Sequence, residues 1–315
     1  MAQLLVVTTE TFGLSIKTKV GGSWATPIPS IKVGGNWVKA KKIHTKVGGV
    51  WTGVYEYESV YTFPSGIYTD TDLDAIVTDK YHNVKIDLQN GATLRASSTS
   101  AYSLKTGTGY SAGSTLSIHY VQQQSGHGGN GGDGGGGSDP NPARPAASGT
   151  AGGPFALIEC PVTFVFSPFG GSLNQGETTT GISGGSGGGG GGEGRYFLMG
   201  GGGAGGNGKP SGNGGSGSNG NTANGFPHED GKTSNGFGTN DGGFGGTFNL
   251  GTGGRGGSTG FGFGLAGNVG LSASGPNNNI YYGGQTTGPA GSGGAAGVPY
   301  YNPNNHTVTH ILIVD

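Results

Sequence analysis

The chain has 315 residues and a formal net charge of −1, and only 10% of its residues are charged. A composition so near neutrality excludes the basic footprint that binding to nucleic acid or to an acidic membrane requires. The single cysteine excludes a disulfide framework within one chain, and no apolar run reaches the roughly 18 residues of a membrane-spanning helix. The first residues, MAQLLVVTTETFG, lack the basic start of a signal peptide, so we expect synthesis in a cytoplasm and no membrane insertion.

Residues 13–55 contain one motif three times, as KVGGSW, KVGGNW and KVGGVW. Two glycines between short β-like segments indicate a two-residue hairpin turn, which places the lysine of each copy opposite its tryptophan. The expected pairs are Lys19 with Trp24, Lys32 with Trp37, and Lys46 with Trp51. Two interpretations of the tryptophans stay open: they fill the core of a small β domain, or they are exposed anchors for docking. Three copies in one chain also imitate threefold symmetry, so one chain could cap a trimeric partner.

Residues 56–125 are predicted to form a β-rich connecting domain. The stretch YHNVKIDLQNGATLRASS contains an alternating run and then Asn90-Gly91, which is a turn signal. The stretch STSAYSLKTGTGYSAGSTLSIHYV follows and is divided by single glycines. No helix longer than two turns is predicted anywhere in the chain.

Residues 126–315 contain 63 of the 76 glycines. In several glycine tracts the residues other than glycine recur at every third position, a spacing that we call the triplet frame; His127, Asn130 and Asp133 are an example. A period of three matches neither an α-helix nor a strand, but it matches an extended left-handed helix with three residues per turn. Such a helix has no internal hydrogen bonds, so its backbone must bond to neighbouring helices that only glycine allows to approach. We predict a sandwich of polyglycine II helices with Ala204 at an outward position. The alternative is a disordered low-complexity tail.

Three apolar segments among the glycines favour the ordered interpretation. GGPFALIECPVTFVF contains Cys160, which we expect to be a small buried hydrophobic residue rather than a nucleophile. GRYFLMGGGG places large apolar residues against a glycine tract. HTVTHILIVD ends in four apolar residues from Ile311 to Val314, which are predicted to form a buried strand.

Glycine-rich sequence produces false motifs, and none of the candidates has the context that its chemistry needs. GAGGNGKPS has the frame of a phosphate loop, but Pro210 stands where Ser or Thr binds magnesium. Ser186 and Ser258 lie in G-x-S-x-G frames without a strand–turn–helix. His306 and His310 lie about 13 Å apart on a strand, too far for one metal. We therefore expect no enzyme activity, no metal site and no cofactor.

Four segments break the triplet frame and mix aromatic residues with Asn, Ser, Gly and Pro. They are 138–154, 222–241, 272–287 and 298–305. This mixture is typical of loop-based binding surfaces. The candidate receptor-binding residues are Phe226, His228, Phe237, Tyr281, Tyr282, Tyr300 and Tyr301. The alternative is that these side chains fold back and cap the ends of the sandwich.

The alternation of glycine tracts with aromatic loops resembles the tail-fibre tip adhesins of T-even-type bacteriophages. The run AGSTLSIHYVQQQSGHGGNGGDGGGG, followed by CPVTFVF and GISGGSGGGGGG, is similar to a wider set of glycine-rich phage tail proteins. The KVGGxW repeats are similar to N-terminal pieces of other tail-fibre proteins, although this N-terminal domain differs from that of the T-even-type adhesins. The resemblance implies a non-enzymatic receptor-binding protein of the virion. Its N-terminal domain would dock onto a trimeric tail-fibre or tail-tip protein, and its distal loops would bind a bacterial outer-membrane protein or surface glycan.

The predicted fold class is mainly β and irregular, with little or no α-helix. We expect an attachment domain of β-hairpin repeats in 1–55, the β-rich connecting domain in 56–125, and the polyglycine II sandwich with receptor-binding loops in 126–315. The rival function is that of an ice-binding or structural glycine-rich protein, which would show one flat face of repeated Thr or Ala. The outward positions here are mixed. A glycan depolymerase would need paired carboxylates in a cleft, and acidic residues are sparse.

Overall fold

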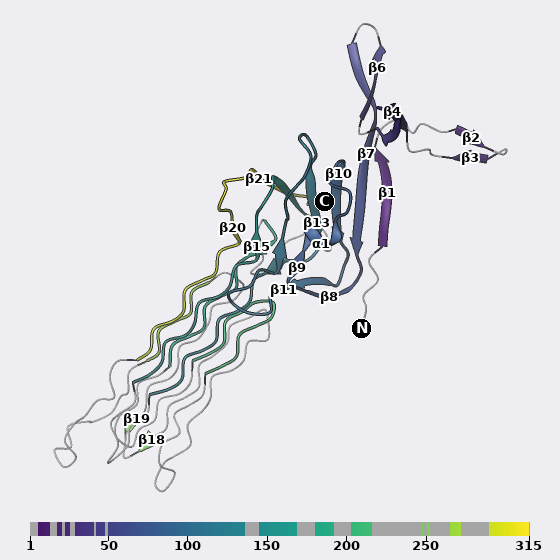
Figure 1. Ribbon diagram of the computed structural model, residues 1–315. Coiled ribbons are helices and arrows are strands. Elements are labelled where there is room, and N and C mark those ends of the chain that lie inside the picture. The colour runs from purple at the N-terminus through teal and green to yellow at the C-terminus, as the bar shows by residue number, and fades with distance from the viewer. Residues whose placement is uncertain are drawn as a thin grey trace.

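The structure, a computed structural model, describes residues 6–12, 18–20, 23–25, 29–40, 42–47, 50–135, 145–168, 180–191, 203–215, 247–248, 251–252, 265–271 and 290–314. Within these residues the backbone is mainly strand and irregular, and α1 (Leu73–Ile76) is the only helix. This agrees with the predicted class. Figure 1 shows hairpins at one end of the molecule, a body of strands in the middle, and glycine tracts extending from the body at the other end. Within the same residues, no helix has the length and apolar character needed to cross a bilayer.

The body is a parallel β-solenoid, in which each turn of the chain, or rung, adds a strand to stacked parallel sheets. The largest sheet contains the parallel strands β7 (Val50–Phe63), β10 (Asn83–Leu88), β13 (Leu116–Tyr120), β16 (Val162–Phe166) and β21 (Val308–Leu312). A second sheet contains β9 (Thr71–Asp72), β12 (Leu104–Lys105), β15 (Ala156–Leu157) and β20 (Tyr300–Tyr301). The remaining face pairs β8 (Gly66–Thr69) with β11 (Ala92–Arg95), and β14 (Gln124–Ser125) with β17 (Ile182–Ser183).

The solenoid core consists of apolar side chains stacked in columns from rung to rung. The strand registers align Tyr61, Ile86, Ile118 and Phe164 in one column, and each of these side chains is at most 2% exposed. Alternate residues of β13 are buried, as expected when one face of a strand packs on a core. Cys160 is buried in this core as predicted. Asn90-Gly91 forms a turn, but it joins two faces of one rung instead of closing a hairpin.

The first rung is closed by additional segments. β1 (Val6–Phe12) and β6 (Lys42–Val47) pair antiparallel with β7. The short α1 begins after Asp72, whose side chain accepts a hydrogen bond from the backbone N–H of Asp74. Leu73 and Val77 bury their side chains against the core at this end.

The glycine tracts leave the solenoid at one corner, between the β8–β11–β14–β17 face and the second sheet. In the first rung, Asp70 alone connects the strands at this corner, and in the second rung the connection is 96–103. The corresponding connections are 126–155 in the third rung and 184–299 in the fourth. The tracts are therefore long insertions at equivalent positions of successive rungs.

Backbone hydrogen bonds join neighbouring tracts at every third residue. The bonds from tract 184–191 to one neighbour run from Gly185 to Gly153, from Gly188 to Thr150 and from Gly191 to Ala147, over 2.8, 3.0 and 2.9 Å. Tract 184–191 is bonded to five others, which are 126–135, 145–155, 203–209, 265–271 and 290–297, and all of its residues are buried. A Cβ on Gly188 would lie 2.0 Å from the carbonyl oxygen of Asn130, so only glycine fits there.

The triplet frame predicts some side-chain positions and misplaces others, because Ala204 and Asn207 share one frame and both are 0% exposed. Asn130 and Asp133 are exposed and His127 is half-buried, as outward positions should be. Ala204 was predicted to point outward, but it is fully buried. Its tract bonds to 126–135, 184–191 and 211–215, so it has neighbours on several sides. The frame identifies which residues share a face of a tract, but not whether that face meets solvent or another tract.

Two further expectations differ from the structure. The segment near the C-terminus forms a strand, β21, but it is not buried: Ile311, Ile313 and Val314 are 45%, 44% and 55% exposed. The reason is that β21 lies at the edge of its sheet. In addition, the boundary expected between residues 125 and 126 is crossed by the largest sheet, because β13 pairs with β16 and β16 pairs with β21.

Candidate functional site

The hairpins at the N-terminal end form the first candidate binding surface. β2 (Thr18–Val20) pairs with β3 (Ser23–Ala25), and β4 (Ser30–Val33) pairs with β5 (Asn36–Lys39). Gly34 and Gly35 connect β4 to β5 with φ of +56° and +89°. Positive φ at both positions is the signature of a type I′ turn, whose twist matches that of the strands, and glycine adopts it without strain.

The strand registers are those expected from the repeated motif. Lys19 lies opposite Trp24, Lys32 opposite Trp37, and Lys46 opposite Trp51. Trp37 is 73% exposed, and Ile31 on the facing strand β4 is 57% exposed, so Trp37 is not part of a core within this chain. The side chains of Trp24 and Trp51 lie outside the described residues. Figure 1 shows that two of the hairpins project well away from the body.

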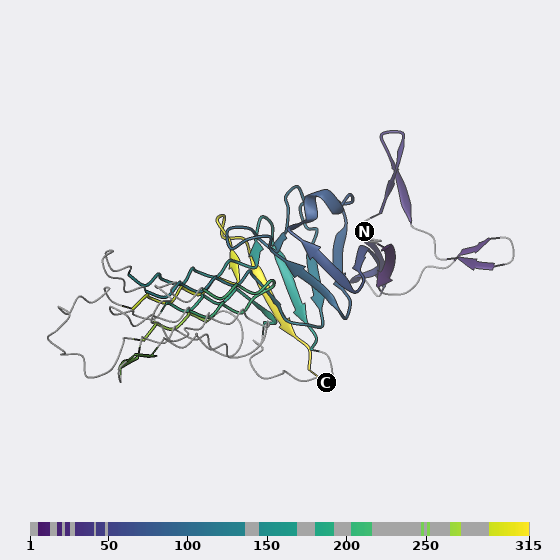
Figure 2. The same ribbon diagram turned by 90° about the horizontal axis from the view of Figure 1, so that it is seen from below.

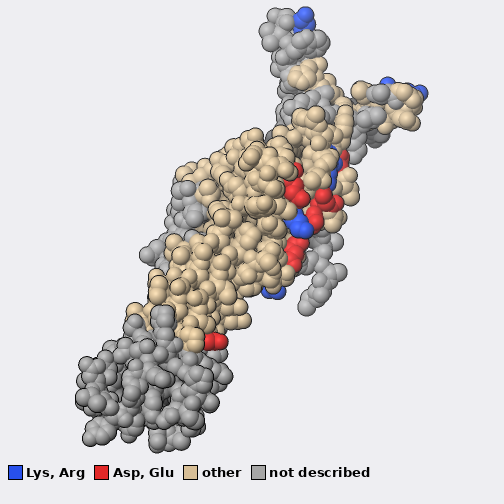
Figure 3. Space-filling model, turned by 60° about the vertical axis from the view of Figure 1, so that its left-hand side comes forward, with Lys and Arg blue, Asp and Glu red and all other residues tan. Residues whose placement is uncertain are grey.

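The hairpin end is basic and the rest of the chain is acidic. Residues 1–55 contain seven lysines and a single acidic residue, Glu10, whereas the remaining residues contain nine basic and 16 acidic ones. Figure 3 shows lysines at the tips of the projecting hairpins and acidic side chains gathered on the body beneath them. The net charge of −1 therefore results from a basic N-terminal part and an acidic remainder of the chain. The lysines of the hairpins favour a partner with an acidic surface.

Of the candidate receptor-binding residues, the structure describes Tyr300 and Tyr301. Phe226, His228, Phe237, Tyr281 and Tyr282 lie outside the described residues. Tyr300 and Tyr301 form β20, where the last glycine tract rejoins the solenoid. Tyr300 is half-buried against the core, and Tyr301 is 53% exposed. The far end of the tracts is instead marked by the antiparallel pair β18 (Thr247–Phe248) and β19 (Gly251–Thr252) (Figure 1).

A sequence signal for the position of β20 was available. Pro154 and Pro299 each follow the end of a glycine tract; Pro299 comes directly before β20, and Pro154 comes one residue before the start of the equivalent segment, with Phe155 between it and β15. The register pairs Ala156 with Tyr300. Comparing GGPFAL with GVPYY would therefore have assigned the tyrosines to a returning strand rather than to a distal loop.

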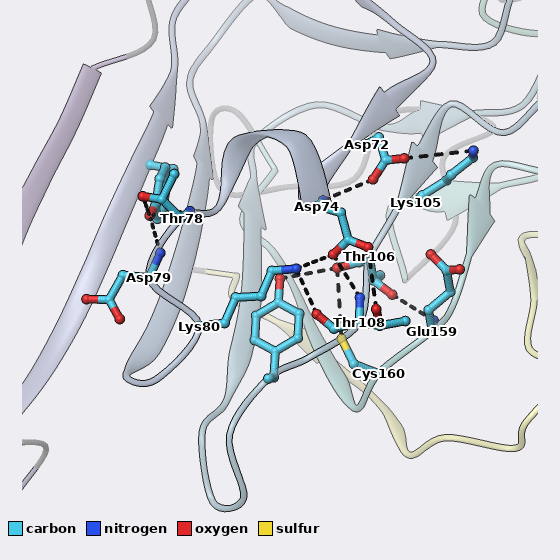
Figure 4. A network of polar contacts seen from close by, with 12 residues as sticks. Asp72, Asp74, Thr78, Asp79, Lys80, Lys105, Thr106, Thr108, Glu159 and Cys160 are labelled. Carbon is cyan, nitrogen blue, oxygen red and sulfur yellow. Dashed lines mark hydrogen bonds and ion pairs between the residues drawn. The ribbon is translucent and has the colours of Figure 1, made fainter.

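A polar cluster beside α1 was the remaining candidate for chemistry (Figure 4). Lys80 forms an ion pair with Asp74 and donates a hydrogen bond to the backbone oxygen of Thr108 at 2.7 Å. Burial acts to raise the pKa of Asp74, but hydrogen bonds from Lys80 and Thr108 bring it below its usual value. Burial raises the pKa of the Cys160 thiol to about 11 and also raises that of the Tyr110 phenol.

The directions of these pKa shifts determine which chemistry the cluster can supply. At neutral pH the thiol and the phenol keep their protons, and the carboxylate is neutralised by the adjacent ammonium group. The cluster therefore supplies neither a thiolate nucleophile nor a proton acceptor, and it acts as a tie between α1 and the loop that contains Thr108. Across the part of the chain that the structure describes, no three His, Cys, Asp or Glu residues are grouped so that they could hold a metal ion.

Comparison of the chain with models of protein families, with curated proteins and with solved structures finds no match in any of the three. Function is therefore inferred from the residues and their geometry.

Proposed function

We propose that the protein is a non-enzymatic receptor-binding adhesin at the tip of a bacteriophage tail fibre or tail. In this proposal the N-terminal hairpins dock onto a trimeric tail-fibre or tail-tip protein. The loops between glycine tracts bind a bacterial outer-membrane protein or a surface glycan. The observation that supports it most strongly is the placement of the projecting hairpins and the far ends of the tracts at opposite ends of the molecule (Figure 1).

We also propose that the glycine tracts are polyglycine II helices. Hydrogen bonds between the tracts recur every three residues, which equals one turn of such a helix. Tract 184–191 has five bonded neighbours, as expected in a close-packed lattice of these helices. At the rise of about 3.1 Å per residue, the tract 126–135 spans roughly 30 Å. The lattice would then be a spacer that holds the loops away from the solenoid.

The hairpins fit the docking role through their repetition. One Lys–Trp pair occupies the same register position in three hairpins, so a threefold-symmetric partner could offer each hairpin an equivalent site. Tryptophan is one of the side chains enriched among the residues that dominate the binding energy of protein interfaces. The lysine opposite it adds attraction to an acidic surface, which should weaken as salt is raised.

The ice-binding alternative is less well supported by the described surface. A flat face of repeated threonines should offer free hydroxyl groups, but the Thr150 hydroxyl accepts a hydrogen bond from the backbone N–H of Asn130 at 2.7 Å. The exposed residues of the neighbouring tract, 126–135, are Asn130 and Asp133. An adhesin tolerates this variety, because its specificity resides in loops instead of a regular face.

The proposal is tested with particles that lack this protein. They should fail to adsorb to host cells, and adsorption should return when the wild-type chain is supplied during assembly. Replacement of Trp24, Trp37 and Trp51 together by Ala should abolish incorporation, while the purified variant still binds the cell surface. The proposal is wrong if particles without the chain adsorb normally, and inhibition of ice growth by the purified chain would favour its rival.

A further inference from the structure

The two ends of the solenoid are finished differently. At the first rung, β1 covers the outer edge of β7, and Tyr61 and Phe63 are each 2% exposed. At the last rung, β21 is the terminal strand of the same sheet. Figure 2 shows β1, in purple, at one end of the row of strands and β21, in yellow, at the other. The side chains of Val308 and Leu312 pack on the core but are only half-buried.

The outer edge of β21 presents backbone groups that its sheet does not use. Val162 donates a hydrogen bond to the oxygen of Thr307 at 3.0 Å, and Ile313 donates to the oxygen of Phe166 at 2.8 Å. In a parallel ladder alternate residues bond to the same neighbour, so odd-numbered residues of this segment face β16. The N–H and C=O groups of Val308, His310 and Leu312 therefore point away from the sheet.

Exposed apolar side chains are concentrated in the C-terminal part of the chain, which includes β21. Eight of the twelve large apolar side chains that are at least 42% exposed in the described part of the chain lie between residues 265 and 314. They are Leu265, Val269, Leu271, Val298, Tyr301, Ile311, Ile313 and Val314. Gly267 donates a hydrogen bond to Gly294, which joins tract 265–271 to the tract that leads into β20. We call 265–271 together with 290–314 the terminal face.

The terminal face lacks the features that protect open sheet edges. Natural edge strands are commonly guarded by charged residues or by proline. No charged residue occurs from 256 to 314, and β21 itself contains no proline. His310 stacks on Phe164 with ring centroids 5.6 Å apart, and its Nδ1 is buried without a hydrogen-bond partner among the described residues. An unguarded sheet edge is expected where another chain completes the sheet.

We propose that the terminal face is the interface between two copies of this chain, with β21 of one protomer paired antiparallel to β21 of its partner across a twofold axis. A neutral apolar surface meets itself without charge repulsion, and it offers no charge with which to select an acidic or a basic partner. An axis through His310 places Val308 opposite Leu312 of the other copy. The outward-facing N–H and C=O groups of Val308, His310 and Leu312 then form hydrogen bonds with β21 of the other copy, and the two solenoids share one continuous sheet.

This inference is independent of the proposed adhesin function, because it concerns the purified chain alone. Sedimentation velocity over a concentration series should show a dimer with a Kd below about 10 µM. The variant Thr309→Lys with Ile311→Lys should be monomeric, since the twofold axis places the new lysines opposite one another. The matched control is Ile67→Lys with Thr69→Lys on β8, also two exposed positions with the same spacing, and it should remain dimeric.

Amide exchange resolved to single residues provides a second measurement that does not depend on a variant. In the wild-type dimer the amides of Val308, His310 and Leu312 should be protected. In the lysine variant they should exchange freely, while the amides of residues 309 and 311 remain bonded to β16 and protected. A wild-type chain that stays monomeric, or that forms a larger assembly in which these three amides exchange freely, overturns the proposal. If the lysine variant does not fold, the wild-type mass and exchange pattern decide alone.

Discussion

The solenoid and the glycine tracts are both stacks of extended chain, but different groups hold them together. In the solenoid, columns of Ile, Leu and Phe side chains are buried, and each buried side chain contributes about 1.5–3 kcal/mol. In the tracts, each residue from 185 to 191 donates a backbone hydrogen bond, and side chains contribute little. One such bond contributes about 0.5–1.5 kcal/mol net, whereas fixing one backbone residue costs about 1–2 kcal/mol. The tracts therefore depend on the solenoid to hold their ends together.

The largest expected effect comes from adding a side chain where backbones touch. A Cβ on Gly294 would lie 1.9 Å from the carbonyl oxygen of Thr150, so Gly294→Val should destabilise the tracts by more than about 4 kcal/mol. The neighbouring Ala295 is exposed, and Ala295→Val should change stability by less than about 0.5 kcal/mol. Thermal unfolding of both variants gives the comparison. Equal melting temperatures would mean that the tracts are not closely packed.

A substitution in the solenoid core tests whether the tracts depend on the solenoid while the solenoid does not depend on the tracts. Ile118 is 1% exposed in the middle of the solenoid, and Ile118→Ala should lower the free energy of unfolding by about 2–5 kcal/mol. Amide exchange should then quicken in the solenoid and in the tracts together. In Gly294→Val it should quicken in the tracts while the amides of β10 and β13 stay protected. Fast exchange of the solenoid in both variants would show that the two regions unfold as one unit.

If the proposed function is correct, substitutions in the receptor-binding loops should have a smaller, local effect. We expect Phe237→Ala to lower adsorption at least tenfold, about 1.4 kcal/mol, with little change in melting temperature. Tyr301→Ala removes an aromatic side chain of β20 that is 53% exposed at the solenoid, and adsorption should be unchanged. Adsorption rates of particles that carry each variant measure the difference. If Tyr301→Ala causes the larger loss, the recognition surface lies on the solenoid.

The smallest effect concerns pH. Burial lowers the pKa of His310 below 6.5, and burial followed by the nearby Lys85 lowers that of His119. Unfolding then takes up protons, so stability is complete above about pH 6.5 and decreases as pH falls below that value. The melting temperature should fall by a few degrees between pH 7 and pH 5. His310→Phe should reduce this dependence, and an unchanged pH profile would show that His310 does not contribute to it.

Structure that depends on neighbouring residues could be predicted from the sequence, whereas the pairing of segments far apart in the chain could not. The KVGGxW motif predicted the register of Lys32 opposite Trp37, because a two-residue turn determines the pairing of the strands beside it. The glycine period predicted hydrogen bonds three residues apart. The solenoid was not foreseen, since partner residues in adjacent rungs are 25, 32, 46 and 146 positions apart and no repeat of constant length is visible.

For the candidate sites too, local motifs could be identified from the sequence, whereas positions that depend on the fold could not. The repeated motif predicted the strand positions of the tryptophans, and Trp37 is exposed, as the docking interpretation expects. Tyr300 and Tyr301 were assigned to a binding loop from composition alone, but aromatic residues beside Pro and Asn also occur where a strand begins. The open edge at β21 was missed, because an apolar run predicts a strand without showing whether both of its neighbours are present.

The corner from which the tracts leave has a consequence for how such a chain can change. In the first rung a single residue, Asp70, closes the corner, and in the fourth rung the same corner accommodates residues 184–299. The solenoid therefore sets no length for what is inserted there, provided that the inserted chain returns to the second sheet. Tracts can be gained or lost in pairs, one outgoing and one returning, without any change to the core. The body is thus a frame in which the inserted segment can be exchanged as a unit, by recombination in nature or by grafting in the laboratory.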